Sequence, residues 1–117
     1  MLRRTPVVLA LAVALGACGG DAQCGGGARS GLSVWAERAG LGAAFTLEHA
    51  RPDTDWRLTV VHEGHIAWRG GARTDGGGAL KVIRRFGDYP GVDHVSVRAI
   101  APDGATCAAS VAFADEK

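Results

Sequence analysis

The sequence has little charge imbalance and few of the residues on which common cofactor sites depend. Thirteen Lys and Arg face twelve Asp and Glu in 117 residues, so the formal charge is +1. This balance lacks the concentrated positive field of nucleic-acid-binding proteins and polybasic membrane-surface proteins. The three cysteines contain no Cys-x-x-Cys pair, the usual ligand spacing of a structural zinc site. The length allows one domain of ordinary size.

Long hydrophobic runs are also missing, and the one apolar stretch lies at the N-terminus. Arg3 and Arg4 precede an uncharged run from Pro6 to Leu15. A bilayer crossing takes about 20 residues, so this run is too short to span a membrane. A positive segment followed by a short apolar one is typical of a secretory signal peptide.

The apolar stretch ends in the motif Leu15-Gly16-Ala17-Cys18. This motif resembles the lipobox of bacterial lipoproteins. The resemblance implies that residues 1–17 are a lipoprotein signal peptide and that Cys18 becomes the lipidated first residue of an extracytoplasmic chain anchored to the cell membrane. The alternative is ordinary cleavage before Gln23, which would release a secreted protein.

Lipidation of Cys18 would leave two cysteines, Cys24 and Cys107, in a chain whose charge is about −1 once Arg3 and Arg4 are removed. An even number of cysteines in an exported protein favours a disulfide. Pairing Cys24 with Cys107 would close a loop of 83 residues, which stabilises a fold by about 4 kcal/mol in the chain-entropy model. The alternatives are two free thiols, or pairing of Cys24 between molecules.

A glycine-rich segment separates the proposed anchor from the rest of the chain. Residues 18–31 have the composition of a flexible tether, which buries little apolar surface. We therefore expect the folded domain to occupy residues 32–117.

Residues 32–117 alternate between apolar and polar side chains with a period of two. The clearest case is Val95, Val97 and Ala99, which alternate with polar neighbours. This pattern predicts antiparallel strands with one buried and one wet face, and no stretch has a sustained helical period. The predicted strands are 32–38, 42–49, 56–61, 65–69, 79–86, 93–100 and 105–113. Between the last two strands, Ala101-Pro102-Asp103-Gly104 predicts a type I turn with a G1 bulge.

About seven short strands predict an all-β antiparallel sandwich. Trp56 on the third strand, and the segment from Pro90 to Ala99 leading to Cys107, resemble small immunoglobulin-like domains of bacterial envelope proteins. The chain departs from antibody domains because its predicted second and sixth strands contain no cysteine. The bridge proposed here instead joins the segment before the first strand to the last strand. Abundant Gly, Ala and Arg indicate a high-GC bacterial source.

Two histidines at a predicted hairpin tip are the best candidates for metal ligands. His62 and His65 flank the turn, with Glu63 between them, and imidazole suits zinc or copper outside the cytoplasm. Nothing in the pattern brings His49 or His94 to this tip. We interpret the tip as a solvated hairpin turn and expect no metal or other cofactor; an extracytoplasmic copper- or zinc-binding protein that uses His62 and His65 is the alternative.

The remaining polar residues do not predict an enzyme. Asp93, beside a predicted turn, is interpreted as a turn-capping carboxylate. Ser96 and Ser110 fall on outward strand positions, and neither lies in a nucleophile elbow. The glycine-rich segments also lack the Lys-Ser or Lys-Thr that follows a phosphate-binding loop.

The outer face of the predicted third, sixth and seventh strands is the best candidate for a binding surface. It combines Arg57, Arg98 and Ile100 with small residues, so a partner can approach closely. We therefore expect a non-catalytic structural or interaction module of the cell envelope, with no nucleic-acid partner. A further alternative is a small inhibitor or carbohydrate-binding sandwich that uses Trp35, or Trp68 on the same face as Ile66.

Overall fold

The computed structural model describes residues 18–19, 21–24, 27–87 and 92–114. The expected signal peptide, residues 1–17, lies outside them. The strands of the described ranges are β1 (Cys18–Gly19), β2 (Asp21–Cys24), β3 (Arg29–Glu37), β4 (Gly40–Glu48), β5 (Asp55–His62), β6 (His65–Arg73), β7 (Leu80–Phe86), β8 (Val92–Ile100) and β9 (Thr106–Ala114). In these ranges no helix is long and apolar enough to cross a membrane.

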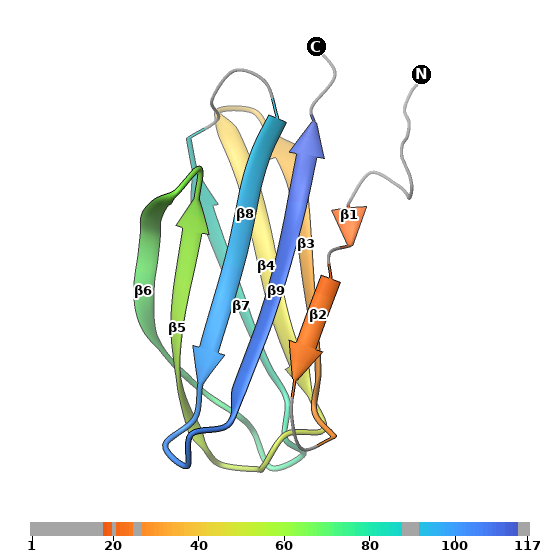
Figure 1. Ribbon diagram of the computed structural model, residues 1–117, viewed down its shortest axis with the longest axis vertical. Helices are drawn as coiled ribbons and strands as arrows, with labels where there is room; N and C mark the ends of the chain where they lie inside the picture. The colour runs from red at the N-terminus through yellow and green to blue at the C-terminus, as the bar shows by residue number, and fades with distance from the viewer. Residues whose placement is uncertain (1–17, 20, 25–26, 88–91, 115–117) are drawn as a thin grey trace.

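The strands form two antiparallel sheets packed face to face (Figure 1). The smaller sheet has the order β1-β3-β4-β7, and the larger has the order β2-β9-β8-β5-β6. The prediction of an immunoglobulin-like sandwich of about seven strands is confirmed by β3 to β9, whose bounds lie within a few residues of those predicted. The expected third, sixth and seventh strands correspond to β5, β8 and β9, which are neighbours in the larger sheet.

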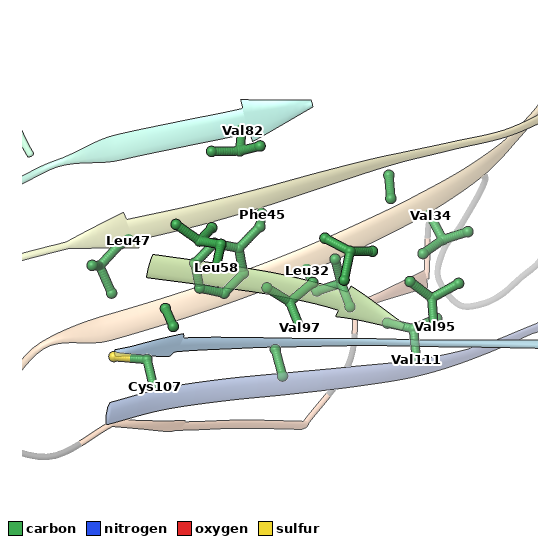
Figure 2. Packing of buried hydrophobic residues seen from close by; sticks show 14 of the residues in the cluster. Leu32, Val34, Phe45, Leu47, Leu58, Val82, Val95, Val97, Cys107 and Val111 are labelled. Atoms are coloured by element: carbon green, nitrogen blue, oxygen red, sulfur yellow. The ribbon is translucent and has the colours of Figure 1, made fainter. Parts of the chain in front are cut away.

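The core lies between the sheets and follows from the alternation in the sequence. Figure 2 shows Leu32 and Phe45 of the smaller sheet packed near Leu58 and Val97 of the larger one. Each of these side chains is almost completely buried. Full burial of such a side chain stabilises the fold by about 1.5–3 kcal/mol.

The segment before β3 crosses from one sheet to the other along one side of the sandwich (Figure 1). Cys18 pairs with Val34 of β3 in the smaller sheet, whereas β2 pairs with β9 in the larger sheet. Part of the range expected to form a tether, residues 18–31, therefore belongs to the sheets, and β3 already begins at Arg29. Backbone pairing with two exposed sheet edges explains this difference, because it depends little on the side chains of the segment.

The predicted cysteine pair is present where β2 ends and β9 begins. Cys24 and Cys107 are cross-strand partners, and their sulfur atoms lie 2.08 Å apart. The bridge ties the segment before β3 to the last strand, as the sequence predicts, and Cys107 is buried in the core.

The same end of the sandwich is closed by two sets of turn contacts. Thr74 is 1% exposed, and its hydroxyl donates to the Arg51 carbonyl and accepts from the Thr54 amide, which joins the β4–β5 and β6–β7 connections. In the β8–β9 turn, Gly104 has a φ of 93° and its N–H donates to the Ala101 carbonyl. The turn geometry predicted for this segment is therefore present.

Candidate functional site

The outer face of the larger sheet brings together the residues that the sequence predicted for a binding surface. Arg57 of β5 pairs with Ile100 of β8, and Thr59 pairs with Arg98. Directly paired residues point to the same side of a sheet. All three predicted residues, Arg57, Arg98 and Ile100, are exposed on this face, as we expected.

A shallow depression of about 710 Å³ occupies the middle of this face. The residues along it are mainly small or aliphatic and come from four strands: Thr59, Val61, Ile66, Ser96, Arg98, Ile100, Ala108 and Ser110 on the outer face, together with Val97 and Ala109, whose side chains are buried in the core. Ile66 is 54% exposed and Ile100 is 41% exposed. The depression therefore offers apolar surface that the fold itself does not cover.

The charge around the depression is positive. Thr59 lies between Arg98 of β8 and Arg69 of β6, and Arg57 follows on the same face of β5. None of these three arginines forms an ion pair with another residue of the described ranges. Their charges are thus available to a partner, and Arg69 is a member of the surface that the sequence analysis did not identify.

A β-bulge explains why Ile66 belongs to this surface. The expectation that Ile66 and Trp68 share a face is wrong, because the pairing of β5 with β6 shifts register between Val60 and Val61. Ile66 pairs with outward-facing Val61, whereas Trp68 pairs with Val60 and packs against the core. One extra residue in a strand reverses the faces on which later residues lie.

The two tryptophans suggested for ligand stacking are partly covered by other residues. The Arg84 guanidinium lies 4.0 Å from the centroid of the Trp68 ring. Trp35 lies over Gly42 on the outer side of the smaller sheet, where a Cβ atom on Gly42 would come within 2.4 Å of the indole. The Trp35 Nε1–H donates to Glu37, and this bond, together with Arg85, lowers the pKa of the Glu37 carboxyl below its ordinary value of 4.5.

At the opposite end of the sandwich from the disulfide, β5 ends and β8 begins with a buried polar pair. The Nε2 atom of His62 lies 2.7 Å from Oδ1 of Asp93, and the two side chains are 5% and 0% exposed. The His62 ring also packs on Phe86, with ring centroids 4.7 Å apart. The interpretation of Asp93 as a turn-capping carboxylate is therefore wrong, because Asp93 lies inside β8 and points to the core side.

Glu63 extends this pair toward solvent. It occupies the two-residue β5–β6 turn with a φ of 53°, followed by Gly64 at 78°, which are the left-handed values of a type I′ hairpin. Its carboxylate accepts a hydrogen bond from the backbone N–H of His94 and lies 3.1 Å from His94 Nδ1. These contacts, the backbone bond above all, lower the pKa of Glu63 below 4.5.

The structure changes the set of residues that belong to the hairpin tip. His94 was not expected there, but antiparallel pairing places the start of β8 beside the end of β5. His65 pairs with His62 in the register of the hairpin but is exposed. One potential ligand atom each from His62, Glu63 and Asp93 lies within 4.8 Å of the others. We call these three residues the His62 cluster.

The alternation of inward and outward residues along β5 and β8 indicates the buried His62–Asp93 pair. His62 continues the inward series of Leu58 and Val60, and Asp93 begins the inward series of Val95 and Val97. A polar residue in each of two adjacent inward series indicates a buried polar contact, because such groups need partners.

Comparisons with known proteins gave no matches. No protein-family model matches the chain. No curated protein and no solved structure matches it significantly. The functional argument therefore depends on the geometry described above.

Proposed function

We propose that the chain is a lipid-anchored, non-catalytic binding module of the bacterial cell envelope, and that the outer face of the larger sheet contacts a protein partner. The observation that carries the proposal is the depression beside three arginines that have no ion pair within the described residues. A matching partner presents apolar side chains flanked by carboxylates. Arginine is enriched in protein interfaces and pairs with carboxylates through two parallel hydrogen bonds.

The chemistry of the lining favours binding over catalysis. Thr59, Ser96 and Ser110 supply hydroxyls, and Arg98 is the charged residue of the lining. A hydroxyl becomes a nucleophile when a neighbouring base accepts its proton. The lining residues include no His, Asp, Glu or Cys to act as that base.

The proposed anchor and the depression are compatible in position. β1, which contains Cys18, lies at the edge of the smaller sheet next to β3, whereas β6 with Ile66 lies at the far edge of the larger sheet (Figure 1). A lipid on Cys18 would hold the β1–β2 side near the membrane. The β5–β6 hairpin would then face away from the membrane and be accessible to a partner.

The anchor is tested by producing the full chain in a bacterium and measuring its intact mass and its partition into detergent. We expect a chain that begins at Cys18 and carries the mass of a lipid modification. The Cys18→Ser variant is the control and should remain unlipidated and aqueous. A wild-type chain that begins at Gln23 without added mass would contradict the anchor and leave the binding surface to be judged separately.

The binding surface is tested by photo-crosslinking in cells. A photoreactive amino acid in place of Ser110 should give a discrete adduct with one envelope protein, whereas the same amino acid in place of Ser33, on β3 of the other sheet, should not. Arg98→Glu should weaken the Ser110 adduct because it reverses the charge beside the depression. Arg29→Glu, on β3, is the matched charge control. Equal adducts from both positions would refute the proposed surface.

A further inference from the structure

The two carboxylates of the His62 cluster lack a permanently positive partner among the described residues. Glu63 and Asp93 bring two carboxylates to one place, and within the described residues Glu63 pairs with the imidazole of His94 and Asp93 with that of His62. An imidazole carries a positive charge only when it is protonated. Neither carboxylate has a lysine or arginine ion-pair partner in this part of the chain.

Asp93 provides an independent observation that points to a ligand. Its side chain is fully buried, and its Oδ1 atom faces His62. The second oxygen, Oδ2, is buried with no hydrogen-bond partner among the described residues. A buried carboxylate oxygen that is left in this state costs free energy, whereas a cation held by both oxygens of Asp93 would satisfy it.

The dimensions and donor atoms of the cluster suit a transition-metal ion. Zinc binds histidine nitrogen and carboxylate oxygen at about 2.0–2.2 Å, so its tetrahedral ligands lie about 3.3 Å apart. The His62–Asp93 contact of 2.7 Å needs to open only slightly to reach this spacing, and each of the three ligand atoms starts within 4.8 Å of the others. Calcium, in contrast, takes six to eight oxygen ligands and does not match a set that includes imidazole.

The burial of the three residues leaves a route to the cluster. The side chains of His62 and Asp93 are closed off on the core side, whereas the Glu63 side chain is 30% exposed. His94, whose side chain is 67% exposed, borders Glu63 on the solvent side. Glu63 and His94 therefore form the solvent-facing side of the cluster, from which an ion would approach, whereas strand pairing holds the backbone beside the buried pair.

From this geometry we propose that His62, Glu63 and Asp93 bind a divalent transition-metal ion that accepts mixed nitrogen and oxygen ligands, with zinc as the representative. The fourth position faces solvent and His94. The proposal replaces His65 with Glu63 and Asp93 as the partners of His62. Binding displaces the proton that lies between His62 Nε2 and Asp93 Oδ1, either to Nδ1 of the same ring or to buffer, because ligating imidazole and carboxylate must be deprotonated at the ligating atoms.

Calorimetric titration of the full, oxidised chain with zinc chloride, after removal of metals by a chelator, tests the proposal. We expect saturable binding of one ion per chain. Cobalt in place of zinc should give the visible absorption bands of a low-coordinate site. Calcium chloride should produce no saturable heat.

Two variants at the same hairpin separate this site from the alternative built on His65. Glu63→Gln keeps the size and the partly exposed position of the side chain but removes a charged ligand, and it should weaken zinc binding at least about tenfold. His65→Ala is the matched control and should leave the affinity unchanged. Circular dichroism establishes that both variants are folded.

Two outcomes would overturn the proposal. One is a wild-type chain that takes up no zinc at micromolar concentrations. The other is binding that is lost in His65→Ala and retained in Glu63→Gln, which would assign any metal to exposed histidines. Asp93→Asn keeps the shape of the buried pair and provides a second test, since it should also weaken zinc binding in a folded protein.

Discussion

Breaking the Cys24–Cys107 bridge should remove a large part of the stability of this domain. The two cysteines are 83 residues apart in sequence, so the bridge closes almost the whole folded chain into one loop. Confining a loop of this length lowers the entropy of the unfolded chain by the equivalent of about 4 kcal/mol at 25 °C. Native domains have net stabilities of about 5–15 kcal/mol, so the reduced chain should lose between about a quarter and about four-fifths of its stability.

Urea denaturation followed by tryptophan fluorescence measures this effect. Trp56 is 3% exposed in the folded protein and should report the transition. All samples carry Cys18→Ser, which removes a third thiol and with it thiol–disulfide exchange with the bridge. We compare the oxidised chain, the same chain in reductant, and the double variant Cys24→Ala and Cys107→Ala without reductant.

The two unbridged samples should agree more closely with each other than with the oxidised chain. The double variant also loses the buried sulfur of Cys107, which adds a cavity cost of about 1 kcal/mol. The slope of unfolding free energy against urea should rise when the bridge is absent, because the unfolded chain then exposes more surface. A difference below about 1 kcal/mol between oxidised and reduced chains would refute the entropic argument.

Three further predictions concern the rest of the fold. Gly78→Ala should destabilise the protein by about 1–3 kcal/mol more than Gly104→Ala in urea denaturation. Both glycines have positive φ, but a Cβ on Gly78 would lie 2.1 Å from the Ala50 carbonyl oxygen, whereas a Cβ on Gly104 would meet open space. Equal losses of stability in the two variants would contradict this prediction. Leu58→Ala should lower the free energy of unfolding by about 3–5 kcal/mol because Leu58 is fully buried between the sheets, and a loss below about 1 kcal/mol would show that the core is loosely packed. The pKa of Asp75 lies below its ordinary value of 3.8 because backbone N–H groups of Ala79 and Gly77 donate to its carboxylate. The ionised carboxylate should therefore stabilise the fold fully above pH 3.8, and this stabilisation should disappear as the pH falls through the lower pKa of the folded state. The difference in melting temperature between wild type and Asp75→Asn should therefore shrink in acid, and a difference that is constant with pH would contradict the mechanism.

The strands and their buried faces were predictable because they depend on local alternation. In β8, Val95, Val97 and Ala99 face the core while Arg98 and Ile100 face outward, as a period of two requires. The placement of Arg57, Arg98 and Ile100 on one outer face followed from the same parity once β5 and β8 were assumed to be neighbours. The β8–β9 turn was equally predictable because Gly104 supplies the positive φ that the turn needs.

The residues that the sequence analysis misplaced depend on contacts between distant segments. The bulge opposite Val60 and Val61 reverses the faces of Ile66 and Trp68, and no residue type in β6 signals it. His94 reaches Glu63 across 31 positions of sequence because β8 runs antiparallel to β5. The pairing of β2 with β9 was missed for a related reason, since backbone hydrogen bonds form without a distinctive side-chain pattern.

The amino-acid sequence alone determined that the segments from β3 to β9 become strands, which side of most of these strands is apolar, and that Cys24 and Cys107 can pair. Those properties depend on residues two apart in the chain and on the cysteine count, both of which are read without knowing the fold. The tertiary structure decided the register between strands, and register decides which side chains meet. The burial of Asp93 against His62 and the depression beside Ile66 therefore arise from long-range pairing, because hydrogen bonds between sheet neighbours bring together residues that lie far apart along the chain.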